Sequence, residues 1–278
     1  MKAVIVTGAS SGIGKAAALR LASRGYEAWA GVRSAKDSAF WESVPHASPL
    51  LLDVTQETSV QSAMDRLRPL LKDAQEVHLV NNAGIAVAGP VEGVSIQRWR
   101  EQFEVNVFGL VRITQALLPF IRATRGRIVN VSSVSGLATS PYMGPYSASK
   151  FAVEAISDAL RRELRQFGCK VIVVEPGPIA TPIWEKNLER KEKLLADLSE
   201  EIKNIYRHEL ELFQKGVKHT ARNAAPVERA SGAIEKALLL RNPRTRYVVG
   251  RKTLNAEMAF ASFLPDSWVD SLVARQFR

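Results

Sequence analysis

The chain has 278 residues, of which 46% are hydrophobic and 24% charged, which suits one large α/β domain or two small domains. Its formal net charge of +10 favours anionic partners, such as a phosphorylated cofactor, an acidic membrane surface or nucleic acid. The single cysteine, Cys169, excludes an internal disulfide and makes a reducing, cytoplasmic compartment the expectation.

Several classes of protein are not expected from this sequence. Basic residues are spread along the chain, apart from a cluster at Arg241, Arg244, Arg246, Arg251 and Lys252. No zinc-ligand spacing or RNA-binding signature accompanies that cluster, so we interpret it as a solvated basic face and expect neither nucleic acid nor metal. The N-terminus lacks the layout of a signal peptide, and apolar runs such as 258–264 are too short to span a bilayer.

The predicted elements alternate along the chain. Seven runs rich in Val, Ile and Leu, without polar alternation, predict strands covered on both faces, at 2–8, 26–32, 49–54, 77–84, 126–133, 170–177 and 246–250. Helical patterns lie between them, for example at 12–24, 60–71 and 150–164. Strands that alternate with helices predict an α/β fold with one doubly wound parallel sheet of about seven strands.

One segment departs from this alternation. In residues 183–220, apolar residues recur every three to four positions, which predicts an amphipathic helix or helix pair inserted between two strands. We therefore expect one domain over 1–278, with a helical substrate lid at 183–225 and a C-terminal extension at 252–278. The apolar and basic residues of that extension could rest on an anionic membrane surface, although packing on the fold or at a subunit contact is favoured.

The first strand ends in a turn rich in glycine, TGASSGIG at 7–14. A sharp turn between a strand and a helix, with little side-chain bulk, lets a pyrophosphate approach the backbone at the helix N-terminus. Three glycines exceed what a plain turn needs, so the turn predicts a dinucleotide site.

The end of the second strand indicates which dinucleotide is preferred. NAD sites usually place an acidic residue there to bind the ribose 2′-hydroxyl, but this strand ends in Gly31-Val32-Arg33-Ser34. An arginine at that place would pair with a 2′-phosphate, which a carboxylate would repel. The sequence therefore favours NADP(H) over NAD(H).

A set of motifs occurs in order along the first 180 residues. Besides TGASSGIG, it includes NNAG at 81–84, Asn106 in FEVNVFG, Ser133 in VNVSSVSG, YSASK at 146–150 and PGPIATP at 176–182. This set resembles the short-chain dehydrogenase/reductase family, in its classical subgroup, and implies a single-domain Rossmann fold. The stretch 144–164 and GPVE at 89–92 resemble the hydroxysteroid and retinol dehydrogenase branch. The resemblance implies a catalytic tetrad of Asn106, Ser133, Tyr146 and Lys150.

The chemistry explains these residue types. Reduction of a ketone needs a proton at the oxygen as hydride reaches the carbon, and a phenol can deliver it if its pKa, ordinarily about 10, is lowered. Lys150 lies one helical turn from Tyr146, where its ammonium, together with the positive nicotinamide of the oxidised cofactor, would favour the phenolate. Ser133 would stabilise charge on the substrate oxygen, and Asn106 is implied to support a proton relay to Lys150.

The resemblance also assigns the remaining contacts. Residues implied to bind the cofactor, besides Tyr146 and Lys150, are Gly8, Ser10, Ser11, Gly12, Ile13, Gly14, Arg33, Asp53, Val54, Asn82, Ile179 and Thr181. For Asn82, a structural role as a backbone clamp is an equal alternative. The expected substrate pocket is mostly apolar and suits a small-molecule substrate that is a bulky lipophilic alcohol or ketone; besides Ser133 and Tyr146 its residues are Leu137, Tyr142, Met143 and Trp184.

Three functions are compatible with these residues. The first is an NADP(H)-dependent oxidoreductase of lipophilic alcohols and ketones, including retinoid-type alcohols and aldehydes. The second is a 3-oxoacyl-thioester reductase, against which the long lid and the lack of an obvious carrier-docking motif count. The third is a non-catalytic NADP-sensing protein, which would be expected to lose the tyrosine. Helix 150–164 is implied to join subunits, so a homodimer or homotetramer is expected.

Overall fold

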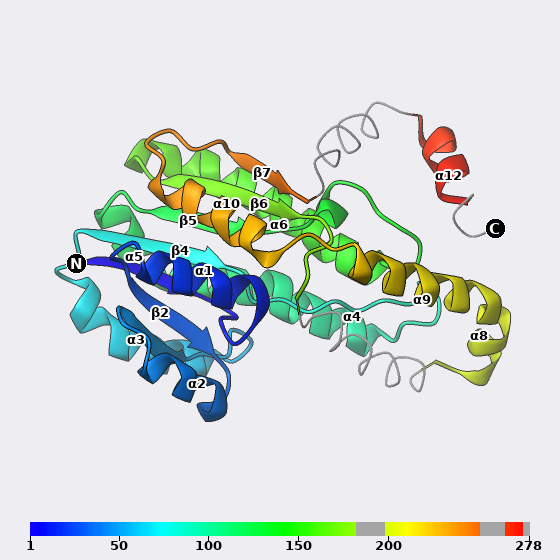
Figure 1. Cartoon of the computed structure of the whole chain (residues 1–278), viewed down its shortest axis with the longest axis horizontal. Helices are drawn as coiled ribbons and strands as arrows, with labels where there is room; N and C mark the ends of the chain where they lie inside the picture. The colour runs from blue at the N-terminus through cyan, green and yellow to red at the C-terminus, as the bar shows by residue number, and fades with distance from the viewer. Residues whose placement is uncertain (182–197, 251–264, 275–278) are drawn as a thin grey trace.

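A computed structural model of the chain describes residues 1–181, 198–250 and 265–274. All seven predicted strands form, in one parallel sheet with the order β3-β2-β1-β4-β5-β6-β7 (Figure 1). The strands are β1 (Lys2–Val6), β2 (Glu27–Val32), β3 (Ala47–Leu51), β4 (Glu76–Asn81), β5 (Arg127–Val131), β6 (Lys170–Pro176) and β7 (Arg246–Val249). The predicted α/β class and single doubly wound sheet are confirmed.

Helices cover both faces of this sheet. One face carries α1 (Gly12–Ala22), α2 (Ala35–Glu42) and α10 (Val227–Leu239), whose buried residues join a core around Leu21, Trp41 and Ile234. The other carries α3 (Glu57–Leu71), α5 (Gly109–Ala123) and α6 (Gly144–Glu163), with Leu67 and Leu117 in a second core. Because side chains on both sides of the strands are buried, an unbroken apolar run is what such a strand needs.

The longest continuous helical stretch runs from Ile96 to Ala123 through α4 (Ile96–Phe103), a π-helical turn η1 (Glu104–Phe108) and α5. By length and composition alone this stretch could cross a membrane, which the sequence interpretation did not foresee. Its residues Ile113, Leu117 and Ile121 are fully buried against the sheet. They are core contacts of this domain, and a helix in the core of a soluble protein can have the same length and apolar composition.

The strand order reverses between β1 and β4, which are neighbours although β2 and β3 separate them along the chain. Successive crossovers therefore leave to opposite sides at this point and open a crevice beyond the carboxyl ends of β1 and β4, where ligands bind in sheets of this kind. The glycine turn after β1 and the NNAG segment after β4 meet there.

The segment predicted as an amphipathic helix pair contains α8 (Glu200–Ile205) and α9 (Arg207–Arg222), which extend to one side of the sheet (Figure 1). Leu198 and Leu210 are buried, whereas Ile205 is exposed. Gly93 makes room for this segment, because a Cβ atom there would lie 2.7 Å from Ile202 and 2.9 Å from Leu198. Residues 182–197 and 251–264, and with them most of the predicted C-terminal extension, lie outside the described residues. The remaining helix, α12 (Asp266–Ala274), lies within that predicted extension.

Candidate active site

The glycine turn leaves backbone exposed where a side chain would block it. Gly8 and Gly12 have positive φ angles of 66° and 58°, which an L-residue with a side chain rarely adopts. A Cβ atom at Gly8 would lie 2.8 Å from Ala83 Cα, and one at Gly12 would lie 3.2 Å from the side chain of Thr181. Thr181 therefore borders the turn, and its predicted contact with the cofactor stays a prediction. Ser11 is the N-cap of α1, but its side chain makes no capping hydrogen bond.

Asn82 clamps this turn to the strand beside it. Its Nδ2 donates to the carbonyls of Thr7 and Gly8 at 3.0 and 3.1 Å. Thr7 Oγ1 in return accepts from the backbone N–H groups of Asn82 and Ala83, both at 3.0 Å. The structure thus gives Asn82 the clamp role that the sequence left open, and it holds the turn in one conformation.

Arg33 lies where β2 ends and is exposed, with no hydrogen bond or ion pair to any described residue. The next residue, Ser34, caps α2 by accepting from the Asp37 backbone. An unpaired guanidinium beside a helix N-terminus has its donors available to an anion. The geometry thus fits the predicted 2′-phosphate contact.

Other predicted cofactor residues have structural partners. Asp53 Oδ1 accepts from the backbone and the hydroxyl of Thr55, at 2.9 and 2.7 Å. Val54 and Ile179 are 6% and 4% exposed, so their side chains belong mainly to the core. Any contact of these two with a cofactor would therefore involve backbone atoms more than side chains.

Asn106 lies in the π-helical turn η1 and is buried. Its Oδ1 accepts from the Ile85 backbone N–H at 2.9 Å, while its Nδ2 donates to the Ile85 carbonyl and to Ser149 Oγ at 3.0 and 3.1 Å. These bonds join the π-helical turn η1, which precedes α5, to the loop after β4 and to α6. The sequence interpretation missed Gln102, which is fully buried and binds the same partners.

Gln102 completes this buried network. Its Oε1 accepts from the Val87 backbone at 2.7 Å, and its Nε2 donates to the Ile85 carbonyl at 2.9 Å and to Ser149 Oγ at 3.2 Å. Ser149 in turn donates to the Tyr146 carbonyl at 2.7 Å. The first turn of α6, which carries Tyr146, is therefore held by two amide side chains one turn apart on the facing helix. In the sequence, only the four-residue spacing of Gln102 and Asn106 could have indicated that both side chains hold this turn of α6.

Ser133 follows the carboxyl end of β5 and is 7% exposed. Its Oγ donates to the Pro176 carbonyl at 3.3 Å and accepts from the Ser135 backbone at 3.1 Å. It also interacts with the Tyr146 phenol, an interaction that lowers the pKa of the phenol. Ser133 and Tyr146, predicted from different motifs, are thus brought together.

Lys150 and Tyr146 lie on the same face of α6. Lys150 is 6% exposed; its Nζ donates to the Val131 carbonyl at 2.8 Å and lies 5.8 Å from the centre of the Tyr146 ring. Burial lowers the pKa of Lys150 to about 8, while Glu154 acts in the opposite direction. Lys150 therefore holds its ammonium proton less strongly than an exposed lysine does.

The surroundings of Tyr146 act on its pKa in two directions. Burial raises the pKa above the ordinary value, and among the described residues the hydrogen bond with Ser133 counteracts this. The lowering expected from the Lys150 ammonium together with the nicotinamide of the oxidised cofactor stays a prediction. The phenol stays protonated at neutral pH, the form that can donate a proton.

The predicted substrate residues lie in the segment that joins η2 (Val134–Gly136) to α6. Leu137 is 39% exposed, and Met143 is the half-buried N-cap of α6. Tyr142 has a φ of 66°, unusual for a residue with a side chain, and its ring contacts those of Tyr206 and Phe213 with centroids 6.3 and 5.5 Å apart. The loop thus meets α9, whereas Trp184 lies outside the described residues.

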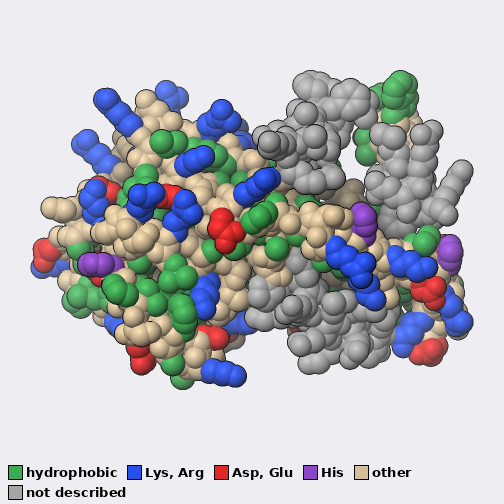
Figure 2. Space-filling model, viewed as in Figure 1, with side chains coloured by type: hydrophobic (Ala, Val, Ile, Leu, Met, Phe, Trp, Pro, Cys, Tyr) green, Lys and Arg blue, Asp and Glu red, His purple; other side chains and the backbone are tan. Residues whose placement is uncertain are grey.

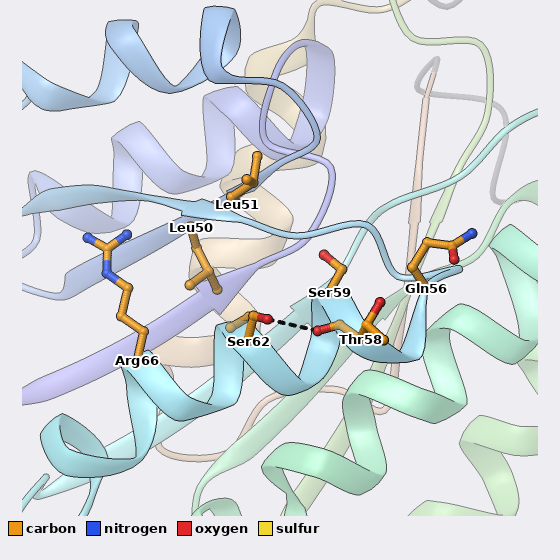
Figure 3. A pocket seen from close by; sticks show the side chains of 8 residues that line it. Leu50, Leu51, Gln56, Thr58, Ser59, Ser62 and Arg66 are labelled. Carbon is orange, nitrogen blue, oxygen red and sulfur yellow. Dashed lines mark hydrogen bonds between the residues drawn. The ribbon is translucent and has the colours of Figure 1, made fainter.

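A hollow of about 440 Å³ elsewhere is not part of this site. It lies between β3 and α3, lined by Leu50, Leu51, Gln56, Thr58, Ser59, Ser62, Ala63 and Arg66 (Figure 3). None of these residues belongs to the predicted tetrad or to the glycine turn. In the described ranges, no group of three His, Cys, Asp or Glu side chains is placed to hold a metal ion.

Arg246 departs from the sequence interpretation. Lys and Arg side chains are distributed over the face shown in Figure 2, and Arg246 was predicted to be part of a solvated basic cluster. Instead its guanidinium forms ion pairs with Glu154, Asp158 and Glu175. The prediction is wrong for this residue, because the inward face of an edge strand cannot be told from its outward face by charge alone.

Known proteins share both the sequence pattern and this arrangement. Residues 2–193 match the family model described as short chain dehydrogenase. The chain belongs to the short-chain dehydrogenase/reductase family. It is similar over its whole length, at 35% identity and 98% coverage of the relative, to an NADPH-dependent 3-dehydrocapnine reductase of Ornithobacterium rhinotracheale.

Two further relatives support the hydroxysteroid and retinol dehydrogenase branch of this short-chain dehydrogenase/reductase family. A 17-beta-hydroxysteroid dehydrogenase type 6 of Bos taurus is 34% identical over 99% of the chain and 89% of the relative. Retinol dehydrogenase 16 of Homo sapiens is 35% identical over 98% of the chain and 87% of the relative. The chain is therefore an oxidoreductase of this family that uses a nicotinamide cofactor.

Solved structures agree on the fold. A short chain dehydrogenase from Burkholderia cenocepacia in complex with NADP matches 100% of both chains with a TM-score of 0.72 at 25% identity. A relative from Burkholderia phymatum in complex with NAD matches 93% of this chain and 92% of that one, with a TM-score of 0.76 at 24% identity. Fold similarity therefore does not by itself choose between the two cofactors.

Proposed function

We propose that this protein is an NADP(H)-dependent reductase of lipophilic ketones, with Tyr146 as the general acid. The observation that carries the proposal is the group at the start of α6, where Ser133, Tyr146 and Lys150 come together. No substitution interrupts the tetrad, which counts against a non-catalytic sensor.

The residues present fit an NADP cofactor. The turn at Gly8, Gly12 and Gly14 offers a cradle that Cβ atoms would fill, and Arg33 offers unpaired donors for a 2′-phosphate. Thr181 borders the same turn. The reduced nicotinamide, when bound, supplies the hydride for the substrate carbonyl carbon. The name of the 3-dehydrocapnine reductase, which specifies NADPH, supports the same choice.

Each tetrad residue then has a distinct task. Tyr146 donates its proton to the substrate oxygen, and its raised pKa keeps that proton in place until the oxygen becomes basic. Ser133, which is 7% exposed, donates a hydrogen bond to the same oxygen and stabilises its developing charge. Lys150 balances the phenolate that remains, and Asn106 holds the loop and helix that carry these groups.

The substrate class is inferred from the segment beside Tyr146. The aromatic cluster of Tyr142, Tyr206 and Phe213 offers apolar contacts where α9 meets the loop before α6. The names of the relatives, a hydroxysteroid dehydrogenase and a retinol dehydrogenase, support a lipophilic alcohol or ketone. We propose that α8 and α9, the described helices of the predicted lid at 183–225, cover that substrate.

NADPH oxidation with a panel of steroid, retinoid, acyl-thioester and small aromatic ketones tests this proposal. Turnover of bulky lipophilic ketones that requires Tyr146 is expected. A preference for acyl thioesters would support the alternative 3-oxoacyl-thioester reductase. Absence of turnover across the panel, with NADPH bound, would favour a sensor.

A further inference from the structure

A cluster of charged side chains lies beneath Lys150, where α6 packs against β6 and β7. Arg246 of β7 donates to Glu154 Oε2 through Nε at 3.3 Å and through Nη2 at 3.2 Å. Its Nη2 also donates to Asp158 Oδ1 at 3.0 Å. Asp158 has two further partners on its own helix, Arg161 and Arg162. One guanidinium thus serves several carboxylates at once.

Glu175 of β6 is the most enclosed of these carboxylates. The residue is 0% exposed, and neither of its carboxyl oxygens has a hydrogen-bond partner among the described residues. Arg246 Nε lies 3.2 Å from Glu175 Oε1, but the geometry of that contact is not that of a hydrogen bond. Glu154 Oε1 is likewise buried without a partner in the described ranges.

Glu175 is poorly compensated if both glutamates are ionised. Among the described residues Arg246 is the only cation that acts on Glu175, and it is shared with Glu154 and Asp158. An ionised carboxylate that is buried without hydrogen bonds is costly, and a neighbouring carboxylate makes it more so. Uptake of one proton removes the excess charge. Burial first, and then the charge of Glu154, raise the pKa of Glu175 to about 7.

This cluster connects to the active site through α6. Glu154 is one helical turn beyond Lys150 and is the one carboxylate whose charge counteracts the effect of burial on that lysine. Glu175 interacts with Glu154 and not directly with Lys150. The protonation of Glu175 therefore reaches Lys150 by way of Glu154.

We propose that the buried Glu175 carboxyl, which lacks hydrogen-bond partners among the described residues, takes up a proton near neutral pH, and that Glu154 and Glu175 act as positioning residues that set the charge facing the Lys150 ammonium. With the proton on Glu175, the charge of Glu154 is left to support the ammonium. The groups involved are Lys150, Glu154 and Asp158 on α6, Glu175 on β6 and Arg246 on β7. For the reaction, the inference rests on the proposed role of Lys150.

The first test follows the titrations in the unliganded protein. Infrared difference spectra should show a buried protonated carboxyl that loses its proton around pH 7, near the pKa of about 7 of Glu175. The signal should be absent in Glu175→Gln. In parallel, carbon-13 NMR of labelled lysine, with Lys150→Met for assignment, should place Lys150 near its pKa of about 8. A Glu175 that is fully ionised at pH 6 would overturn the proposal.

The second test separates the pair from general stability. Glu154→Gln removes the charge that supports the ammonium, so the Lys150 midpoint should fall by about one unit or more. Glu235→Gln is the matched control, because Glu235, like Glu154, is buried and paired with arginine. Its partners are Arg20 and Arg24, and it lies on α10, away from Lys150 on α6. This substitution should lower the melting temperature without moving the Lys150 midpoint. An unchanged midpoint in Glu154→Gln would also overturn the proposal.

The pH profile of kcat then shows whether the pair matters for the reaction. If part of that profile follows the protonation of Lys150, Glu154→Gln should move that part to lower pH. Glu235→Gln should leave it in place. If the titrations behave as expected but Tyr146→Phe remains fully active, the proposed function fails and the acid pair stands. If Tyr146→Phe is inactive and the midpoints do not move, the pair fails and the proposed function stands.

Discussion

The two sides of the site are held in different ways. The side formed by the turn after β1, the NNAG segment and the start of α6 is fixed by buried hydrogen bonds from Asn82, Asn106 and Gln102. The side formed by residues 137–143, α8 and α9 is held by ring contacts of Tyr142 and by few buried side chains. Ile205 and Leu137 on that side are 59% and 39% exposed.

This difference separates chemistry from recognition. Buried polar groups with all partners satisfied permit only one arrangement, so they fix where a proton donor lies. Apolar ring contacts near solvent can repack around ligands of different shape at lower cost. We therefore expect substitutions on the first side to change rate or cofactor binding, and substitutions on the second side to change the choice of substrate.

The largest effect is expected from Tyr146→Phe, which removes the proton donor but keeps the ring. General acid catalysis contributes about 10²–10⁴-fold, so kcat for a lipophilic ketone should fall by that order. NADPH affinity, measured by fluorescence titration, should be retained. Tyr142→Phe is the matched control and should keep most activity. The assignment is wrong if the Tyr142 variant is inactive and the Tyr146 variant is active.

Gly14→Ala should cost nearly as much, but through the cofactor. A Cβ atom at Gly14 would collide with Asn82 Nδ2 and lie 2.5 Å from the Gly8 carbonyl oxygen, so the clamp on the turn must shift. NADPH binding should weaken by about tenfold or more, since a shift of the turn costs on the order of 1.4 kcal/mol. Gly25→Ala, with no atom within 4 Å of its Cβ but a φ of 81°, serves as a control for strain alone. Equal cofactor affinity in both variants would contradict the cradle.

Arg33→Ala should narrow the preference for NADPH over NADH. A charged contact to the 2′-phosphate contributes about 1.5–3 kcal/mol, roughly 10- to 150-fold in the ratio of the two dissociation constants. Arg33→Lys should keep part of the preference, because a lysine supplies charge without the two-pronged geometry. Isothermal titration with both cofactors measures the ratio. Equal affinities in the wild type would remove the reason for proposing NADP.

A smaller and more selective effect is expected from Phe213→Ala on the second side. Loss of its ring contact with Tyr142 should raise KM for a bulky ketone by about threefold to tenfold, since an aromatic pair contributes about 0.5–1.5 kcal/mol. KM for a small ketone and NADPH affinity should hardly change. A uniform loss for both substrates with a lower melting temperature would show that α9 only stabilises the fold.

The outward face of α6 leads to a prediction about assembly. Phe151 is 45% exposed, and Ala155 and Ala159 follow at helical spacing on the same exposed face. We propose that this face joins a second subunit, as the resemblance implied. Light scattering at micromolar concentration should give the mass of a dimer or tetramer, and Ala155→Glu should reduce it. A monomer mass for the wild type would contradict the proposal.

The sequence by itself determined the sheet and the reaction machinery. Every predicted strand formed, and most were readable because parallel strands buried on both faces need unbroken apolar runs. The glycine turn and the spacing of Tyr146 and Lys150 were also readable, because each is a local requirement: a backbone without side chains, and two residues on one helical face. These features depend on neighbours within a few positions.

Only the tertiary structure decided the features that join distant residues. Arg246 was read as solvent-facing, yet it pairs with Glu154, which lies 92 positions earlier in the chain. Burial raises the pKa of the Tyr146 phenol, and that burial depends on what the fold packs around it. Glu175 had no local signal at all, and Gln102 had only its four-residue spacing from Asn106. Charge and hydrogen-bond partners come from long-range packing, and no local pattern specifies them.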